Sequence, residues 1–386
     1  MVTSTQPPTR TVIAPTPTPV PAPADSALRH LGPNWYATVM GTAILVTAGT
    51  ALPYHSPAAR TALTGVWILA VALLAVILVS RALHWRRHRD QARTHLLDPA
   101  VAPFYGCLAM AVLAVGGATL AVGPDVIGEG AALVMGAALW SVGTVLSLLA
   151  AAGIPYLMVV RHRIDGAHSA SPVWLLPVVA PMVSAALGPQ LIPHLPQGQG
   201  RTAMLLGCYA MFGLSLLASL LLLPLVLTRL LVHGPLPLAL TPTLFLVLGP
   251  LGQSTTAVNQ LADVAPGAIG ATYAHGFQAF AVVYGIPVLG FALLWLALAT
   301  ALVVRAARAG MPFAMTWWGF TFPVGTCVTG AAGLARHTGL DALGWLAAGL
   351  YVLLVLAWAV TAIRTVRGLA GGTLLAAPRP VRPALG

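Results

Sequence analysis

Apolar runs of about 20 residues, long enough for membrane helices, recur from Pro33 to about Ile363, and short polar or Gly/Pro-rich breaks separate them. A helix of this length crosses the hydrocarbon core of a bilayer, which is about 30 Å thick. We expect ten such helices, at residues 33–53, 62–83, 101–122, 131–158, 172–192, 203–228, 239–262, 276–303, 312–333 and 342–363. The sequence therefore predicts an all-α integral membrane protein with ten transmembrane helices.

Arginines are distributed unevenly between the breaks. Only 7% of the residues are charged, whereas a soluble domain averages roughly 25%. Of the 19 basic residues, 16 lie in the tails or in the breaks that follow even-numbered runs, and the others are Arg60, Arg201 and Arg336. Cytoplasmic loops carry the excess of arginine, so we expect both termini in the cytoplasm of a multi-pass plasma-membrane protein. The basic residues form no continuous tract, which argues against a nucleic-acid partner.

The two ends of the chain differ in composition from the apolar runs. Residues 1–30 are rich in Pro, Thr and Ala and contain no apolar stretch typical of a signal peptide. Segments of this composition bury too little apolar surface to fold, so we expect a disordered cytoplasmic tail at 1–30. A second disordered tail is expected at 369–386. The membrane domain then spans residues 31–368.

Residues that loosen helices concentrate in the odd-numbered runs. The first run carries Gly41-Thr42 and the third carries Gly116-Gly117. The fifth, seventh and ninth runs carry the internal prolines Pro177, Pro181, Pro242, Pro250 and Pro323. Broken backbone at membrane depth must be buried in protein or line a water-filled cavity. We therefore predict five helical hairpins around a central pore, with odd-numbered helices inside and even-numbered helices outside. Three even-numbered runs also contain a proline, so the difference between odd-numbered and even-numbered runs is a tendency and not a strict rule.

Ionisable side chains avoid the middle of the runs. The eight acidic residues lie at run ends or in breaks, and no arginine lies well inside a run. Proton relays and ion-coupling sites in membranes use buried ionisable groups, and acid–base catalysis needs a positioned one, so we do not expect an enzyme. Broken helices offer free N–H groups and dipole ends to an anion, and nearby arginines attract it. The expected substrate is a small anion.

No pattern in the chain suggests a metal or a cofactor. Cys107, Cys208 and Cys327 lie singly within apolar runs, as small buried residues do. His84 and His88 have a spacing that can ligate a metal on a helix, but arginines surround them and would repel a cation. We interpret this stretch as a basic cytoplasmic helix end, and most of the other histidines as solvated or snorkelling residues near the membrane interfaces. No cofactor and no metal are expected.

Two short stretches are candidates for the lining of the pore. In LGPLGQS (248–254), Gly249 and Pro250 precede Gln253 and Ser254. This stretch either packs helices closely through its small residues or lines the pore with its hydroxyl and amide groups. In TWWGFTFPVGTC (316–327), Phe320 and Phe322 are two positions apart, so only one of them can face a pore. The adjoining Pro323 favours a pore position for this pair.

Five segments together resemble one known family. They are GPNWYATVMGTAIL (32–45), DPAVAPFYG (98–106), PVWLLPVVAPMVSAALG (172–188), LGPLGQS (248–254) and WWGFTFPVG (317–325). Over roughly residues 30–368 the chain is similar to the tellurite-resistance/dicarboxylate transporter family. That family includes plant slow anion channels, the yeast malate permease and the fungal sulfite pump. The resemblance implies a ring of five helical hairpins and a homotrimer.

The resemblance also implies a function and a gate. Its members pass small anions, either inorganic anions or small organic acids such as C4-dicarboxylates, through a central pore. The alternative is a proton- or potential-coupled exporter of sulfite, an organic acid or an acidic metabolite. In the family a phenylalanine on the ninth helix closes the pore, and by motif Phe322 matches best, with Phe320 second. The kinked fifth helix of the family maps onto Pro177 and Pro181, and the seventh onto Gly249 and Pro250.

Overall fold

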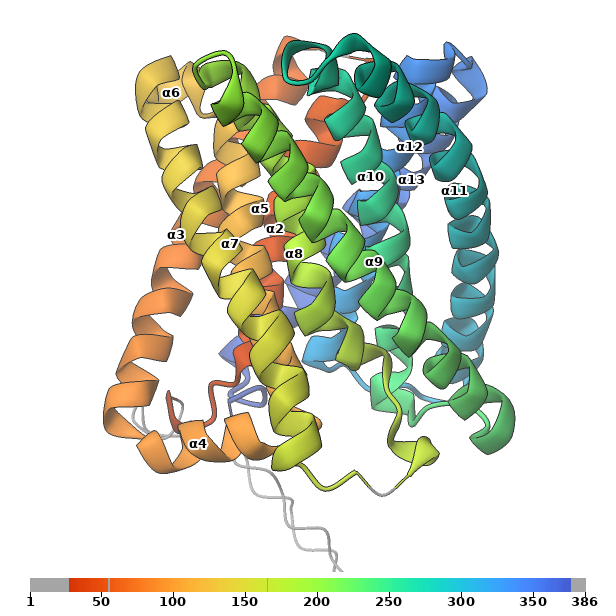
Figure 1. Cartoon of the computed structure of the whole chain (residues 1–386). Coiled ribbons are helices and arrows are strands. Elements are labelled where there is room, and N and C mark those ends of the chain that lie inside the picture. Colours follow the sequence, from red (N-terminus) through yellow and green to blue (C-terminus); the bar gives the residue numbers. More distant parts are fainter. Residues whose placement is uncertain (1–27, 55, 165, 376–386) are drawn as a thin grey trace, which may run out of the picture.

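The computed structural model describes residues 28–54, 56–164 and 166–375, which form helices and no strand (Figure 1). The tails predicted to be disordered fall mostly outside these residues. Of the first tail, only residues 28–30 are described, and they begin a short helical turn. The last helix continues to Ala370, so the second tail begins slightly later than the expected residue 369.

Five long, continuous helices form the outside of the described bundle. They are α3 (Pro57–Arg87), α7 (Glu129–Val160), α9 (Gln199–His233), α11 (Ala271–Arg308) and α13 (Asp341–Ala370). Only 22% to 28% of their most apolar stretches is buried. Large apolar side chains such as Val159 and Leu221 are exposed on them. An exterior this apolar is stable in lipid and not in water.

Five shorter helices lie inside and are almost entirely buried. They are α2 (Tyr36–Ala51), α5 (Gly106–Val122), α8 (Leu175–Leu187), α10 (Leu248–Val264) and α12 (Phe322–Thr338). A 3-10 helix leads into each of them, namely η1 (Pro33–Trp35), η2 (Ala102–Tyr105), η4 (Pro172–Trp174), η6 (Leu238–Val247) and η8 (Met315–Phe320). Among the described helices, seven are long and apolar enough to cross a membrane. The crossing of all ten stays a prediction.

The inner helices contact one another in a closed order. Helix α2 packs on α5, α5 on α8, α8 on α10, α10 on α12, and α12 again on α2. We call these five helices the inner ring. Each outer helix covers the junction of two of them, as α7 covers α5 and α8, and α11 covers α10 and α12. This arrangement buries the inner ring against protein on its outer side.

Tryptophan indoles join the outer helices to the inner segments. Five hydrogen bonds do so: Trp67 Nε1 to Thr119 Oγ1 (3.0 Å), Trp140 Nε1 to Ser184 O (3.0 Å), Trp295 Nε1 to Leu244 O (2.9 Å), Trp358 Nε1 to Thr42 Oγ1 (3.0 Å) and, from an inner segment outward, Trp318 Nε1 to Thr365 Oγ1 (3.0 Å). An indole N–H buried in an apolar setting needs such a partner. These bonds therefore favour one register of α3, α7, α11 and α13 against the ring.

The prolines of the inner segments begin helices instead of breaking them. Pro323 lies in the first turn of α12, and Pro177 and Pro250 lie near the starts of α8 and α10. The first N–H groups of a helix have no partner within it, so a proline there removes no hydrogen bond. The run at 312–333 does divide near its middle, between η8 and α12, but Pro323 lies in the first turn of the second helix and not inside a continuous one. Pro181 does lie inside an inner α-helix.

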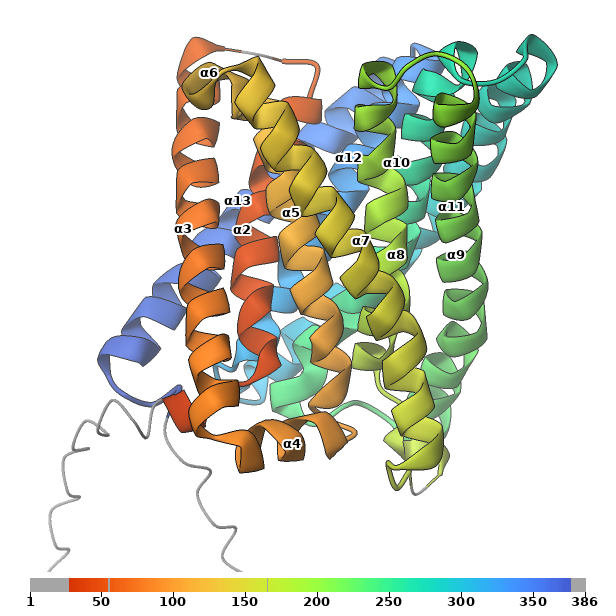
Figure 2. The same cartoon turned by 60° about the vertical axis from the view of Figure 1, so that its left-hand side comes forward.

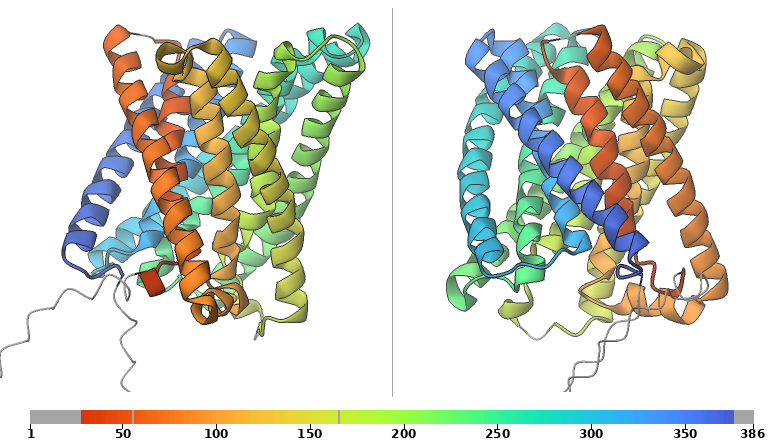
Figure 3. Two further views of the ribbon diagram at one scale, coloured as in Figure 1. Left: turned by 90° about the vertical axis from the view of Figure 1, so that its left-hand side faces the viewer. Right: turned by 180° about the vertical axis from the view of Figure 1, so that it is seen from behind.

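Short helices close the two ends of the bundle. The amphipathic α4 (Arg89–Leu97) lies at one end, close to the first and last described residues (Figures 2 and 3). The opposite end carries the remaining short helices α6 (Pro124–Ile127), η5 (Gly188–His194) and η7 (Ala265–Gly267), while η3 (Ala167–Ser169) follows α7 at the α4 end. Helices α3 and α11 have arginines in their last turns. The sequence did not predict α4.

Several basic side chains at the α4 end are buried, although the sequence had suggested only a basic helix end there. Arg81 was counted from the sequence with the break that follows the second apolar run, but it is only 3% exposed. Its guanidinium donates to Leu31 O and, at 3.0 Å, to Tyr105 Oη. His84 is 0% exposed, and its Nδ1 lies 2.8 Å from Leu28 O. Backbone carbonyls of the N-terminal segment pair with Arg81 and His84, whereas Arg86, Arg87 and Arg89 of the same stretch are exposed, in agreement with a basic helix end.

Candidate functional site

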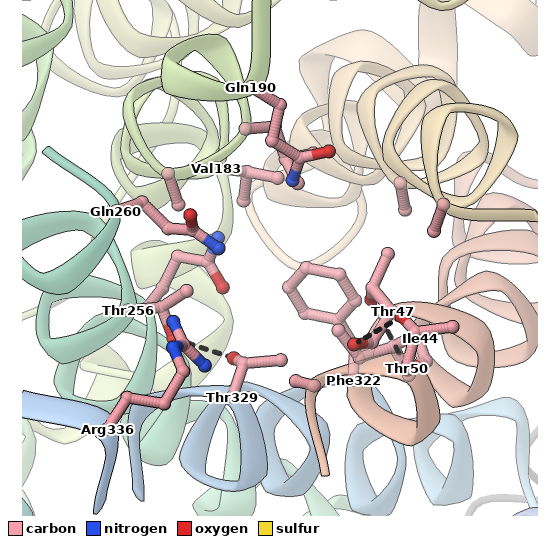
Figure 4. Close-up of a pocket in the computed structure, with 16 residues that line it drawn as sticks. Ile44, Thr47, Thr50, Val183, Gln190, Thr256, Gln260, Phe322, Thr329 and Arg336 are labelled. Atoms are coloured by element: carbon pink, nitrogen blue, oxygen red, sulfur yellow. Dashed lines mark hydrogen bonds between the residues drawn. The ribbon is translucent and has the colours of Figure 1, made fainter. Parts of the chain in front are cut away.

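A cavity of about 280 Å³ lies within the inner ring (Figure 4). All five inner segments contribute to its wall: Ile44, Thr47, Thr50 and Ala51; Ala114 and Ala121; Val183, Ala186, Leu187 and Gln190; Gln253, Thr256 and Gln260; Phe322, Thr329 and Arg336. Except for Phe322, these residues belong to the middle and C-terminal parts of their segments. The cavity therefore occupies the half of the ring that is remote from α4.

The polar groups of this wall fall into two kinds. The threonine hydroxyls are already bonded within the protein, as Thr256 Oγ1 is to Thr326 O (3.1 Å) and Thr329 Oγ1 (2.6 Å). The carboxamides of Gln190, Gln253 and Gln260 make no hydrogen bond with any described residue. Neutral amide groups with free donors therefore line the cavity.

Arg336 lies at the edge of the cavity, beside Thr256 and Thr329 (Figure 4). Its side chain is 46% exposed, and Nη2 lies 3.2 Å from Asp263 Oδ2. His337 Nε2 contacts the other oxygen of the same carboxylate at 3.0 Å. Because the Asp263 carboxylate offsets part of the positive charge, Arg336 can attract an anion without holding it very tightly.

Phe322 forms the boundary between two different environments. It lines the 280 Å³ cavity and also a second cavity of about 20 Å³ on the α4 side. Apart from the backbone of Gly249, the smaller cavity is surrounded by apolar residues, namely Met40, Met110, Leu175, Leu176, Val179, Leu246, Phe322 and Pro323. A narrow apolar segment of this kind resists filling by water and ions. The ring of Phe322 thus lies where a polar cavity meets an apolar constriction.

The local backbone explains why Phe322 and Phe320 differ. Phe322 is the first residue of α12, directly after Thr321, whose hydroxyl donates to Trp318 O at 2.7 Å. Phe320 belongs to the preceding 3-10 helix. Its ring packs edge-on against Phe245 and Trp317, with centroid distances of 4.9 Å and 5.7 Å. The two phenylalanines therefore face different surroundings, as their spacing predicted.

Residues of the LGPLGQS stretch lie in two kinds of surroundings. Gly249 lines the small apolar cavity, and Gln253 lines the large one. Ser254 instead donates to Leu251 O at 3.0 Å within α10. A Cβ on Gly252 would lie 2.6 Å from Thr326 C, so α10 and α12 approach closely there. One stretch therefore combines cavity-lining residues with a close helix contact, and its place in a pore stays a prediction.

The remaining predicted pore residues lie in contacts between helices. Thr42 accepts a hydrogen bond from Trp358 on α13. A Cβ on Gly41 would clash with Trp318, one on Gly116 would press on Leu139, and one on Gly117 would clash with Leu187. These positions therefore permit close helix packing. Pro177, Pro181 and Pro250 are buried in α8 and α10.

The sequence pointed to Gln253 and Phe322 but not to Thr256, Gln260, Thr329 and Arg336, although helical spacing from the first two residues could have revealed them. Gln253, Thr256 and Gln260 follow one another by three and four positions on α10. On α12, seven positions separate Phe322 from Thr329, and seven separate Thr329 from Arg336. Such spacings place side chains on one face of a helix. Prolines and glycines alone do not mark these faces, because the polar residues recur at helical spacing and lie away from the helix breaks.

Comparison with known proteins identifies the family. The SLAC1 family model, described as a voltage-dependent anion channel, matches residues 30–366. The chain belongs to this family. It is therefore a multi-pass membrane protein of the SLAC1 anion channels and transporters. Among the described residues, no group of three or more His, Cys, Asp or Glu side chains is placed to hold a metal ion.

Relatives within the SLAC1 family extend over most of the chain. An uncharacterized transporter of Methanocaldococcus jannaschii is 28% identical over 339 residues, which cover 88% of this chain and 93% of the relative. A second uncharacterized transporter of the same organism is 26% identical over 350 residues, 90% of this chain and 98% of the relative. The sulfite efflux pump SSU1 of Trichophyton rubrum is 26% identical over 317 residues, 81% of this chain and 83% of the relative.

Proposed function

We propose that the chain is a plasma-membrane anion channel whose path runs along the axis of the inner ring, with Phe322 as its gate. The observation that carries this proposal is the position of Phe322 between the 280 Å³ polar cavity and the 20 Å³ apolar one. An apolar constriction next to a wet cavity blocks ions until it widens. Movement of one side chain at the start of α12 is then enough to connect the two cavities.

The direction of the inner helices supports selectivity for anions. The small cavity is lined by residues near the starts of the inner helices, and the large cavity by residues nearer their ends. The five helices are therefore parallel, and their N-termini surround the apolar constriction. Each helix N-terminus carries a partial positive charge of roughly half an elementary charge. An anion in the constriction is stabilised without any charged side chain.

The membrane arrangement is part of the same proposal. Ten helices cross the bilayer as five hairpins, the inner ring facing the path and the outer helices facing lipid. The described arginines gather at the α4 end, which supports a cytoplasmic position for that end and for both termini. The large cavity then opens toward the exterior. By its resemblance to the family, the protein assembles as a homotrimer in which each chain has its own path.

A coupled exporter is the second candidate function. The observation that favours it is the similarity to sulfite efflux pumps. An exporter of sulfite or a small organic acid moves its substrate against a gradient with energy from protons or from the membrane potential. The lining of the large cavity contains no carboxylate, so coupling would have to come from the potential or from the protonation of the substrate.

Flux measurements on the purified full chain in lipid vesicles separate these functions. We expect chloride, nitrate, sulfite or malate to move down an imposed potential faster than in protein-free vesicles, with no dependence on a pH gradient. Accumulation of an anion against its own gradient when only a pH gradient is applied would favour the exporter. Equal flux with and without protein for every anion would contradict both functions.

A further inference from the structure

We propose that the 280 Å³ cavity is a binding site for small oxyanions, in which Gln253, Gln190 and Gln260 donate N–H groups and Arg336 supplies positive charge. This inference rests on the proposed function and names the class of anion that its path selects. The ligand is an anion with at least two oxygen acceptors, such as sulfite or a carboxylate, and not a halide.

Gln253 is the anchor of the proposed site. The residue is only 4% exposed, it lines the cavity, and its carboxamide has no hydrogen-bond partner among the described residues. Its amide atoms are accessible from the cavity and are not enclosed by protein on all sides. Water or a ligand in the cavity is the only group left to satisfy it, because the neighbouring Thr256 hydroxyl is already bonded within the protein.

The other two carboxamides reach the same cavity from different positions. Gln190 belongs to η5, and Gln260 lies two turns beyond Gln253 on α10. Figure 4 shows the carboxamides of Gln190 and Gln260 directed into the cavity above Phe322. Neither makes a hydrogen bond with a described residue. Donors spread over separate elements match a ligand whose acceptor atoms are also spread in space.

The chemistry of these donors favours oxyanions over halides. A carboxamide offers two N–H donors and one carbonyl acceptor. An oxyanion can accept from several amides at once through different oxygens, and a protonated oxyanion can also donate its hydroxyl to a carbonyl. A halide offers a single centre and no donor. The helix C-termini around this cavity carry partial negative charge, so an anion here needs these directed N–H contacts to be held.

Arg336 completes the site at the cavity edge. Its planar guanidinium can contact two oxygens of one anion, which a halide cannot match. Asp263 holds the group at 3.2 Å and leaves it 46% exposed, so the guanidinium remains accessible from the cavity. Arg336 therefore attracts the oxyanion, while the buried Gln253 near Phe322 distinguishes it from chloride.

The first test measures binding without transport. Thermal unfolding of the purified full chain is compared in sodium sulfite, sodium formate and sodium chloride at equal ionic strength. The variants are Gln253→Met, which keeps the side-chain size without the amide, and Gln278→Met, which removes an exposed amide on α11. Salts that are excluded from protein surfaces stabilise all variants alike, so the Gln278→Met protein is the matched control.

We expect sulfite and formate to raise the Tm of the wild type and of Gln278→Met more than chloride does, and this excess to disappear in Gln253→Met. An excess for sulfite alone, or for formate alone, would identify which oxyanion the site takes. If Gln253→Met does not fold, Gln190→Met at the less buried position serves in its place. The same excess in every variant would overturn the proposed site, as would equal effects of all three salts.

The second test measures selectivity during transport. In vesicles, we expect the ratio of sulfite flux to chloride flux to fall about tenfold in Gln253→Met relative to Gln278→Met, as for the loss of one hydrogen bond to a charged ligand. An unchanged ratio would overturn the inference but leave the anion channel in place. Absence of any anion flux would instead contradict the proposed function. In that case the Tm measurement alone would show whether the cavity binds oxyanions.

Discussion

His95 shows how a single half-buried side chain makes stability depend on pH. It lies on α4, outside the membrane helices, and its ring stacks on His84 with a centroid distance of 5.4 Å. Burial, and then the positive charge of Arg81, lower the pKa of His95 to about 4. His84 and His30 lower this pKa as well, whereas Asp98 opposes them. The folded protein therefore resists protonation at this position.

Removal of this histidine has an expected direction. In the unfolded chain a histidine takes up its proton near pH 6.5, well above the folded pKa of about 4. The stability that the neutral His95 contributes is thus fully present above about pH 6.5 and is lost as the pH falls toward 4. We expect the Tm of His95→Gln to fall less than that of the wild type between pH 7 and pH 5.

A matched control for this prediction is the exposed His275 on α11. The Tm of His275→Gln should follow the wild type as the pH falls. Parallel pH dependence of the wild type and His95→Gln would show that the α4 end does not hold His95 in its neutral form.

At the scale of single residues, the sequence could rank Phe322 above Phe320 but could not show their surroundings. The ranking used the match to the family motif and the angle between two positions on a helix. The different packing comes from the change from 3-10 to α-helix at Thr321, and from the rings of Phe245 and Trp317 that surround Phe320. Those contacts depend on segments distant in the chain, so no local pattern predicts them.

At the scale of elements, the contact between α10 and α12 depends on Gly252. A Cβ at this position would lie 2.5 Å from Cys327 N and 2.6 Å from Thr326 C, and neither backbone atom can move aside. We expect Gly252→Ala to destabilise the protein by about 1–3 kcal/mol, as overpacking of a tight interior does. Thermal unfolding of the purified protein measures the change.

Gly290 on α11 provides the control for this substitution. A Cβ there would meet no atom within 4 Å. Alanine is preferred to glycine inside a helix by about 0.5–1 kcal/mol, so Gly290→Ala should leave the Tm unchanged or raise it. If Gly252→Ala also leaves the Tm unchanged, the helices do not approach as closely as the structure shows.

The elements illustrate what a sequence pattern can and cannot predict. Hydropathy alone located the long outer helices, because they are apolar over most of their length, but their ends lie up to seven residues beyond the expected runs. The inner segments were found, but the role of their prolines was misjudged. Pro323 looks internal when the run is treated as one helix, and becomes a helix start once the 3-10 helix η8 is known. The helix α4 was missed because its few apolar residues give no membrane signal.

At the scale of the whole molecule, the ring brings together residues that the sequence keeps far apart. Three residues of the cavity wall, Gln190, Gln260 and Arg336, belong to different segments of the chain. They line one cavity because α8, α10 and α12 are successive members of the closed ring. The sequence predicted that inner helices would surround a path for anions. Which of their faces point inward depends on the packing of the outer helices, so the cavity lining could not be predicted.

The most direct test of the account is the anion flux of Phe322→Ala in lipid vesicles, beside the wild type and Phe320→Ala. All three proteins are compared at equal amounts after gel filtration shows that they are folded. We predict that Phe322→Ala raises anion flux about tenfold or more, because it removes the apolar barrier between the two cavities, and that Phe320→Ala leaves it near the wild-type value. Unchanged flux in Phe322→Ala, or opening by Phe320→Ala alone, would contradict the account.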